Sequence, residues 1–329
     1  MIAPAPLPDA VPANWVDRRA PAALRPWLRL GRFDRPTGIW LLMLPGWQGI
    51  ALAAAMQGSL PDPVLLVLFF LGAALMRAAG CAYNDIVDKD FDAKVARTAG
   101  RPIPSGQISV KQAWAFVAGC CLASLAILLA LSPLAVALGV ASLGLVAAYP
   151  FMKRITWWPQ AWLGLTFNWG ALLGFAAATG VSAAVAGWTF FAEGWLVWIP
   201  GTLALPAVLL YASGVFWTLG YDTLYAIQDL EDDALAGVKS SARRLGAAAR
   251  FAVMGFYAVA LALALAAGMT AGLSVLFLAF MLPYAVQLLG QGLRARIDDP
   301  ARALRLFKSN AWAGLLLFLA ILAGSMHPA

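Results

Sequence analysis

The chain has 329 residues, of which 62% are hydrophobic and only 12% are charged. About half of an ordinary soluble domain is apolar, so this composition excludes a soluble globular protein. The formal net charge of +7 would suit an anionic partner, but in so apolar a chain its distribution first concerns membrane topology. The three cysteines are an odd number and fall in or beside apolar blocks, which predicts neither a disulfide nor a metal–thiolate site.

The apolar residues form blocks of roughly 17 to 25 residues, without the alternation of a transmembrane barrel. They predict an all-α fold, a polytopic membrane helical bundle with about nine transmembrane helices. Residues 1–29 are rich in Pro and Ala and are expected to form a flexible cytosolic tail before a single domain over 30–329. The predicted spans are 36–56, 63–83, 110–130, 133–149, 160–180, 201–221, 251–268, 272–290 and 308–325.

Lysine and arginine fall in every second connection between these predicted spans. They precede the first span and follow the second, fourth, sixth and eighth, whereas the remaining loops between spans contain none. Basic residues gather on the cytoplasmic side of membrane proteins. We therefore expect an integral protein of the bacterial inner (cytoplasmic) membrane, with a cytoplasmic N-terminus and an active site that faces the cytoplasm.

A first acidic cluster follows the second predicted span, over residues 84–92. If that helix continues, Asn84, Asp88 and Asp92 recur at i, i+4 and i+8 and share one face, with Asp85 beside them. A charged cluster after one membrane helix is usually only a solvated cap. A matching cluster elsewhere makes a functional site the better interpretation.

That second cluster follows the sixth predicted span and contains Asp222, Tyr225, Asp229 and Asp233. Their spacing of i, i+3, i+7 and i+11 again predicts one helical face. Stacked carboxylates repel one another unless a cation neutralises them, and oxygen ligands select hard ions such as Mg²⁺. Magnesium commonly shares its ligands with phosphate oxygens, so each cluster is a candidate site for a magnesium–phosphate group.

Basic residues that could bind the remaining phosphate charge lie near both clusters. Arg77 precedes Asn84 by about two helical turns on the same face. Arg101, Lys153 and Arg154 lie in or beside cytoplasmic loops. Each loop cation has a simpler interpretation as a topology signal, and Arg77 as a side chain that reaches the interface. Together with the acidic columns, they favour a magnesium-diphosphate headgroup whose tail lies in the bilayer.

At these residues the sequence resembles the UbiA superfamily of intramembrane prenyltransferases. The two signature motifs correspond to Asn84-Asp85-x-x-Asp88-x-x-x-Asp92 and Asp222-x-x-Tyr225-Ala226-x-x-Asp229-x-x-x-Asp233. The branch that prenylates 4-hydroxybenzoate is the most similar. That branch is indicated by the segments Arg77–Cys81, Arg97–Gly106, Tyr149–Arg154 and Gly220–Ala226.

The resemblance implies a bundle of nine helices around a cavity that opens sideways to lipid. A polyprenyl diphosphate would bind there through Mg²⁺ and lose diphosphate, leaving an allylic cation. The ring of 4-hydroxybenzoate would attack this cation ortho to its hydroxyl group, a step of ubiquinone biosynthesis. The expected partners are these two substrates and the lipid bilayer, with no nucleic acid.

The resemblance also assigns roles to individual residues. The predicted metal-binding residues are Asn84, Asp85, Asp88, Asp92, Asp222, Asp229 and Asp233, of which Asp85 and Asp222 either bind metal or hold a ligand in place. Asp88, Asp229, Lys153 and Arg154 are the predicted catalytic residues. The predicted substrate-binding residues are Asn84, Arg77, Arg101, Tyr149, Lys153, Arg154, Tyr225 and Arg35. Lys153 and Arg101 are assigned to diphosphate, Arg154 or Arg35 to the acceptor carboxylate, and the two tyrosines to phosphate or the cation.

Two alternatives remain at this level. A prenyltransferase of the same superfamily could use homogentisate, a naphthoate or a haem precursor as acceptor. A cation-coupled membrane transporter would also carry acidic residues, although such residues are expected nearer the middle of the membrane. The sequence predicts neither the prenyl chain length nor the oligomeric state.

Overall fold

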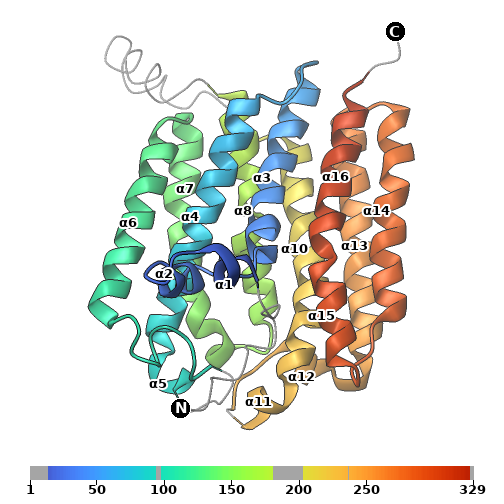
Figure 1. Cartoon of the computed structure of the whole chain (residues 1–329). Helices are drawn as coiled ribbons and strands as arrows, with labels where there is room; N and C mark the ends of the chain where they lie inside the picture. The colour runs from blue at the N-terminus through green and yellow to red at the C-terminus, as the bar shows by residue number, and fades with distance from the viewer. Residues whose placement is uncertain (1–13, 94–97, 181–202, 236, 327–329) are drawn as a thin grey trace. The chain divides into compact units, whose positions relative to one another are not determined.

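The computed structural model describes residues 14–93, 98–180, 203–235 and 237–326, and the secondary structure of these residues is helical (Figure 1). The long helices are α3 (Thr37–Met56), α4 (Pro63–Val87), α6 (Val110–Leu129), α7 (Pro133–Ile155), α8 (Pro159–Thr179), α10 (Leu205–Ala226), α13 (Ala249–Thr270), α14 (Val275–Arg294) and α16 (Asn310–Gly324). The short helices are α1 (Trp15–Arg19), α2 (Arg25–Leu30), α5 (Lys89–Asp92), α11 (Leu230–Leu235), α12 (Ser241–Leu245) and α15 (Pro300–Lys308). Single 3₁₀ turns cover Ile227–Asp229 and Gly246–Ala248.

Among the described residues, eight helical segments are long and apolar enough to cross a membrane. The prediction of an all-α membrane bundle is therefore confirmed. The predicted span 201–221 corresponds to α10, which has 22 residues but is not among the eight. Polar side chains such as Ser213, Thr218 and Asp222 lie along it.

Three helices run further toward the predicted cytoplasmic side than the hydropathy pattern indicates. Helix α4 continues to Val87, α7 to Ile155 and α10 to Ala226. Polar residues from each expected loop are thereby part of a helix. In α7 the helix even passes through Pro150, which lacks an N–H group and marks the predicted end of the span.

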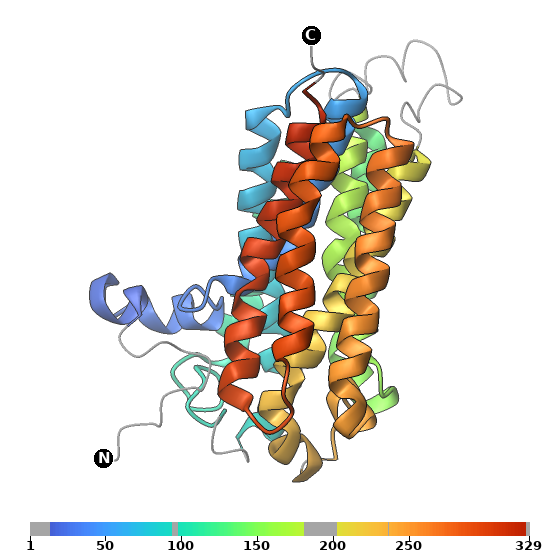
Figure 2. The ribbon, with the colours of Figure 1, turned by 90° about the vertical axis from the view of Figure 1, so that its right-hand side faces the viewer.

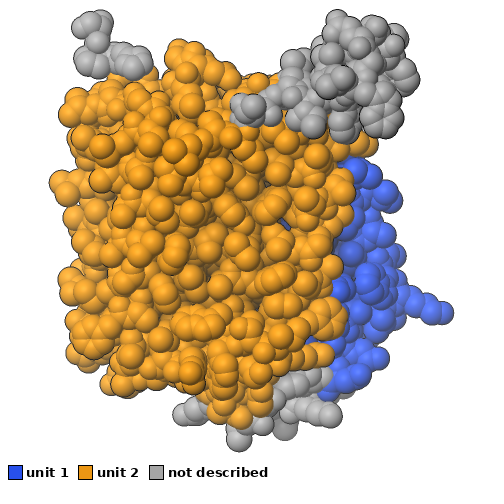
Figure 3. Space-filling view, turned by 180° about the vertical axis from the view of Figure 1, so that it is seen from behind, with its two compact units in different colours: residues 1–40, 71–127 blue, residues 41–70, 128–329 orange. Residues whose placement is uncertain are grey.

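The chain forms two compact units, coloured separately in Figure 3. Unit 1 comprises residues 1–40 and 71–127 and contains the first acidic cluster. Unit 2 comprises residues 41–70 and 128–329 and contains the second cluster.

In unit 1, the part of the predicted tail that the structure describes is folded, contrary to expectation. Helices α1 and α2 bury Val16 and Leu30 completely, and the Trp15 indole donates a hydrogen bond to the Phe33 carbonyl oxygen at 2.7 Å. Leu30 packs in a cluster with Ala82 of α4. Burial of apolar side chains thus orders a segment whose Pro- and Ala-rich composition predicts a flexible chain. Residues 1–13 lie outside the described residues.

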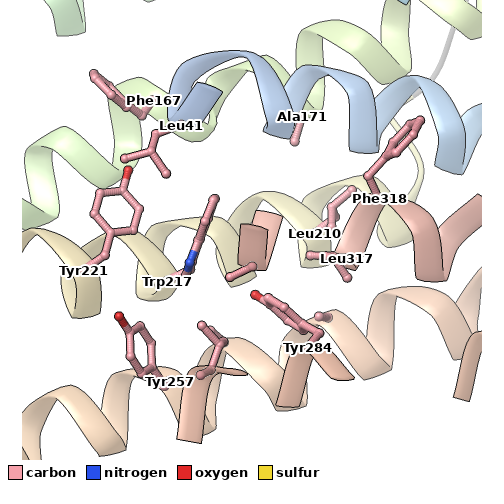
Figure 4. Packing of buried hydrophobic residues seen from close by; sticks show 14 of the residues in the cluster. Leu41, Phe167, Ala171, Leu210, Trp217, Tyr221, Tyr257, Tyr284, Leu317 and Phe318 are labelled. Carbon is pink, nitrogen blue, oxygen red and sulfur yellow. The ribbon is translucent and has the colours of Figure 1, made fainter. Parts of the chain in front are cut away.

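In unit 2, α10 packs against both α8 and α13. Its Trp217 and Tyr221 are buried and form an edge-to-face pair with ring centroids 5.1 Å apart. Figure 4 shows these two rings among core residues from several helices, including Tyr257 of α13. Figures 1 and 2 show α13, α14 and α16 running side by side beyond them. Helix α10 therefore packs between other helices of its unit.

Small residues bring α3 and α8 close together in the same unit. A Cβ atom on Gly49 would lie 2.1 Å from the Ala171 carbonyl oxygen, and one on Gly174 would lie 2.3 Å from the Gly46 carbonyl oxygen. Membrane helices commonly use glycine in this way to let their backbones meet. Elsewhere in the unit, Asn168 of α8 donates to the Thr218 hydroxyl of α10 at 2.7 Å.

Candidate active site

The first acidic cluster lies where α4 passes into α5 in unit 1. The Asp88 N–H donates to the Asn84 carbonyl oxygen at 2.9 Å, and the Asp92 N–H donates to that of Asp88 at 2.8 Å. These helical bonds continue across the turn at Asp88, so the three residues recur on one face as their spacing predicts. The Asn84 side-chain amide also donates to Asp88 Oδ2 at 3.1 Å.

The carboxylates of this cluster are buried. Asp85 is 0% exposed, Asp88 2% and Asp92 4%. Burial raises the pKa of Asp92 above its ordinary value, and the nearby Asp85 and Asp88 add to this effect. Arg101 acts in the opposite direction. Buried carboxylates are stable as anions only beside compensating positive charge.

Arginine side chains supply such charge to two of these carboxylates. Arg32 Nη2 lies 2.6 Å from Asp85 Oδ1 and 2.8 Å from Oδ2. Arg101 Nη1 lies 3.2 Å from Asp85 Oδ1 and 2.6 Å from Asp92 Oδ2. Sequence reasoning assigned Arg101 to this region but missed Arg32. No pattern marks Arg32, because it belongs to a basic stretch that membrane topology alone explains.

Two further predicted arginines, Arg35 and Arg77, also lie in unit 1. Arg35 donates from Nε to Asp34 Oδ2 at 3.2 Å, and burial raises the pKa of Asp34. Arg77 of α4 packs against Gly38 at the start of α3, where a Cβ atom would lie only 2.6 Å from Arg77 Nε. A larger residue at position 38 would therefore require this guanidinium to move.

The second acidic cluster is arranged differently from the prediction of a single helical face. Asp222 and Tyr225 lie on α10, Asp229 lies in the 3₁₀ turn, and Asp233 lies on α11. A 3₁₀ turn rotates about 120° per residue and an α-helix about 100°, so three residues shift the face by about 60°. The regular i, i+3, i+7, i+11 column therefore does not extend beyond Ala226.

Aromatic side chains and a loop surround this second cluster within unit 2. The Tyr225 ring lies 4.6 Å from that of Phe307 on α15. After α11, Arg243 Nη1 donates to the Asp233 carbonyl oxygen at 3.1 Å and also to that of Val238. The Arg243 guanidinium lies 5.6 Å from the Trp157 ring. These contacts hold the loop in shape.

The same loop is attached to the C-terminal end of α7. The Lys239 N–H donates to the Lys153 carbonyl oxygen at 2.9 Å, and Lys239 Nζ donates to that of Ile155 at 3.0 Å. The structure therefore brings the backbone of Lys153 to the segment that follows the second cluster. Tyr149, one turn earlier on α7, packs against the core of unit 2, and Arg154 is exposed.

The only donors that the two motifs offer a metal are oxygen atoms, with Asn84 as the single amide. Within the described residues, no three His, Cys, Asp or Glu side chains gather closely enough to hold an ion by themselves. The donor set and the burial of its carboxylates fit a hard divalent cation such as Mg²⁺. Soft thiolate ligands are absent from both motifs, which disfavours zinc.

A separate cavity of about 270 Å³ lies in unit 2 and is lined by Gln57, Asp62 and Ser132, among others. It adjoins the C-terminal ends of α3 and α8. The second acidic cluster follows the C-terminal end of α10, at the other end of this unit (Figure 1). The cavity is therefore distinct from that cluster.

Comparison with known proteins decides the family. The model of the UbiA prenyltransferase family matches residues 42–322. The chain belongs to this family. A protein from Bos taurus named 4-hydroxybenzoate polyprenyltransferase, mitochondrial, is 42% identical over 97% of this chain and 80% of its own length. The sequence-based resemblance is confirmed, and the chain is an integral membrane protein.

Solved UbiA structures share the fold. A UbiA homolog from Aeropyrum pernix K1 has a TM-score of 0.69 and 25% identity, covering 86% of this chain and 96% of the homolog. A UbiA homolog from Archaeoglobus fulgidus, solved with GPP and Mg²⁺ bound, has a TM-score of 0.58 and 18% identity, covering 88% and 99%. The helical arrangement of the present chain is thus that of the UbiA family.

Proposed function

We propose that this chain transfers a polyprenyl group from polyprenyl diphosphate to the ring of 4-hydroxybenzoate, ortho to the hydroxyl group. The observation that carries the proposal is the 42% identity, over 97% of this chain, to a protein named 4-hydroxybenzoate polyprenyltransferase. The two motifs with oxygen ligands supply chemistry suited to a diphosphate substrate. The product would serve ubiquinone biosynthesis.

Within this proposal, Asn84, Asp88 and Asp92 bind one magnesium ion, and Asp229 with Asp233 binds another. Magnesium would neutralise the diphosphate as it leaves the prenyl carbon. The Archaeoglobus fulgidus homolog was solved bound to GPP and Mg²⁺, which supports this choice of metal. Asp222 lies on α10, one turn before Tyr225, where it would hold a ligand or bind metal itself.

The basic residues and tyrosines would act on the organic substrates. Arg101 and Lys153 bind diphosphate, where their positive charge stabilises the leaving group. The aromatic rings of Tyr149 and Tyr225 screen the allylic cation. The guanidinium group of Arg77 would bind beside the diphosphate. The guanidinium group of Arg154 or Arg35 would form a bidentate pair with the 4-hydroxybenzoate carboxylate.

The charge pattern supports a more specific location than the integral membrane assignment alone. Basic residues occur only in alternate connections, a pattern that supports a cytoplasmic location for the N-terminus and both acidic clusters. We assign the chain to a bacterial inner membrane on this basis. The relative from Bos taurus is named as mitochondrial, so this assignment rests on the charge pattern of the present chain and not on that relative.

A product assay tests the function. Purified protein is incubated with Mg²⁺, a long polyprenyl diphosphate and equal amounts of 4-hydroxybenzoate, homogentisate and a dihydroxynaphthoate, and the products are identified by mass spectrometry. We expect prenylated 4-hydroxybenzoate and released diphosphate. A prenylated product from another acceptor would contradict the proposed substrate, and ion flux without prenyl transfer would contradict the enzyme class.

Variants of the first and second clusters test the mechanism. Asp88→Asn and Asp229→Asn keep the side-chain shape but remove an anionic metal ligand, so each should lower kcat/KM about 100-fold or more. The matched control is Asp90→Asn, because the Asp90 side chain is 89% exposed and lies within the same sequence cluster. Unchanged turnover in the double variant Asp88→Asn with Asp229→Asn would rule out the mechanism.

A further inference from the structure

The Asp85 carboxylate is engaged by arginine from two directions. Both of its oxygens lie within 2.8 Å of Arg32 Nη2, and Oδ1 also lies 3.2 Å from Arg101 Nη1. The Asp85 residue is 0% exposed and Arg32 is 8% exposed. A metal that bound Asp85 would have to compete with charge-assisted hydrogen bonds already made at both oxygens, in a buried position where such bonds are strong.

The backbone conformation of Arg32 also favours this ion pair. Arg32 has a φ of 60°, and no other non-glycine residue among those described has a positive φ. Its Nη1 donates to the Arg29 carbonyl oxygen at 3.1 Å, which fixes the guanidinium from its other end. An arginine with a left-handed backbone conformation is uncommon, and such conformations persist where the surrounding contacts enforce them.

Arg101 connects this pair to a predicted metal ligand. Its Nη1 lies 2.6 Å from Asp92 Oδ2 as well as 3.2 Å from Asp85 Oδ1. The loop that carries Arg101 is attached to α5, because the Thr98 hydroxyl donates to the Asp92 carbonyl oxygen at 2.8 Å. The side chains therefore form a chain of contacts in the order Arg32, Asp85, Arg101, Asp92.

We propose that Asp85 is a positioning residue, anchored by Arg32, that holds Arg101 at the diphosphate site and does not bind metal. This inference rests on the proposed function, since it assigns Arg101 to the prenyl diphosphate. Of the predicted metal-binding residues in the first cluster, Asn84, Asp88 and Asp92 then remain as ligands. Arg32 joins the site as a residue that acts through Asp85.

Equilibrium binding separates a positioning role from a ligand role without any turnover. Mn²⁺ binding to the purified full chain is measured by electron paramagnetic resonance, first alone and then with a non-hydrolysable prenyl thiolodiphosphate. Asp88→Asn serves as the predicted ligand variant and should weaken Mn²⁺ binding about tenfold or more. Asp85→Asn and Arg32→Gln should each leave the Mn²⁺ dissociation constant within about threefold while weakening thiolodiphosphate binding about tenfold or more.

The double variant gives a second, independent test. Because Arg32 and Asp85 act as one pair, Arg32→Gln combined with Asp85→Asn should weaken thiolodiphosphate binding no more than either single change. Each single change leaves one buried charge without its partner, whereas the double variant removes both charges. The double variant can therefore be tested even if a single variant unfolds. Arg101→Lys should recover part of the binding that Arg101→Gln loses, because it keeps the positive charge.

Two results would overturn the inference. One is a loss of Mn²⁺ affinity in Asp85→Asn, or in the double variant, as large as that in Asp88→Asn. The other is independent, additive effects of Arg32 and Asp85 on thiolodiphosphate binding. Neither result depends on the acceptor, so they are distinguishable from failure of the proposed function, which would appear as absence of prenylated 4-hydroxybenzoate in the wild type.

Discussion

Lys239 is bonded to the end of α7 by both its backbone and its side chain. Its N–H donates to the Lys153 carbonyl oxygen at 2.9 Å, and its Nζ donates to that of Ile155 at 3.0 Å. The attachment joins the loop after the second acidic cluster to the helix that carries a predicted diphosphate ligand. It gives that loop a defined position within unit 2.

Loss of this side-chain attachment should weaken substrate binding. Lys239→Met removes the Nζ donor but keeps an aliphatic stem of similar length, so the fold of the helices should be retained. We expect KM for polyprenyl diphosphate to rise about threefold to tenfold, the range of one or two lost hydrogen bonds. Steady-state kinetics and limited proteolysis of the loop measure the effect. Lys111→Met, an exposed site on α6, is the charge-matched control, and an equal change there would contradict the prediction.

Gly38 should control the position of Arg77. Gly38→Ala places a Cβ atom 2.6 Å from Arg77 Nε, so the guanidinium must move. If Arg77 binds substrate, kcat/KM should fall about tenfold, the effect of roughly 1.4 kcal/mol of lost transition-state stabilisation. Gly80→Ala on α4 is the control, because no atom lies within 4 Å of its added Cβ. Equal activity of Gly38→Ala and Gly80→Ala would show that Arg77 is not required in this place.

The close approach of α3 and α8 should be sensitive to a single methyl group. Gly49→Ala places a Cβ atom 2.1 Å from the Ala171 carbonyl oxygen, and backbone cannot rotate away as a side chain can. We expect a loss of about 1–3 kcal/mol in the free energy of unfolding, as for other overpacked sites. Thermal unfolding in detergent measures it. Gly255→Ala on α13 has open space around its Cβ and should unfold at or above the wild-type temperature.

Ionisation of Asp34 should lower the free energy of unfolding as the pH rises. Burial raises its pKa in the folded protein above the unfolded value. The folded state therefore binds this proton more tightly, and the stability contributed by the protonated form is lost as the pH rises through the raised pKa. The unfolding temperature of Asp34→Asn, relative to the wild type, should increase between pH 4 and pH 7. A relative decrease over this range would contradict the assigned direction.

The sequence was sufficient where a feature depends on local bonding. Asn84, Asp88 and Asp92 share a face because helical hydrogen bonds continue through them, and their spacing alone predicts this. The same argument was wrong for Asp229 and Asp233. No Gly or Pro lies between Tyr225 and Asp233 to mark the 3₁₀ turn at Ile227–Asp229. A change of helix type without such a signal depends on packing that the sequence pattern does not contain.

Long-range contacts were the other class of feature that could not be predicted. Arg32 and Asp85 are 53 residues apart, and neither motif nor periodicity connects them. Composition also predicted a flexible tail up to residue 29, whereas burial of Val16 orders α1. The family resemblance was predictable because its motifs are contiguous in sequence.

The limited hydropathy of α10 has a consequence for biogenesis. This helix carries Asp222 and Tyr225 at its end, and it is not among the eight described segments that are long and apolar enough to cross a membrane. A segment of this kind partitions weakly from the translocon into lipid by itself. Its contacts with α8 and α13 replace lipid around its polar side chains. The helix that carries Asp222 and leads into the turn and helix that carry Asp229 and Asp233 should therefore enter the bilayer only together with its neighbours. Completion of the catalytic machinery would then depend on correct membrane insertion.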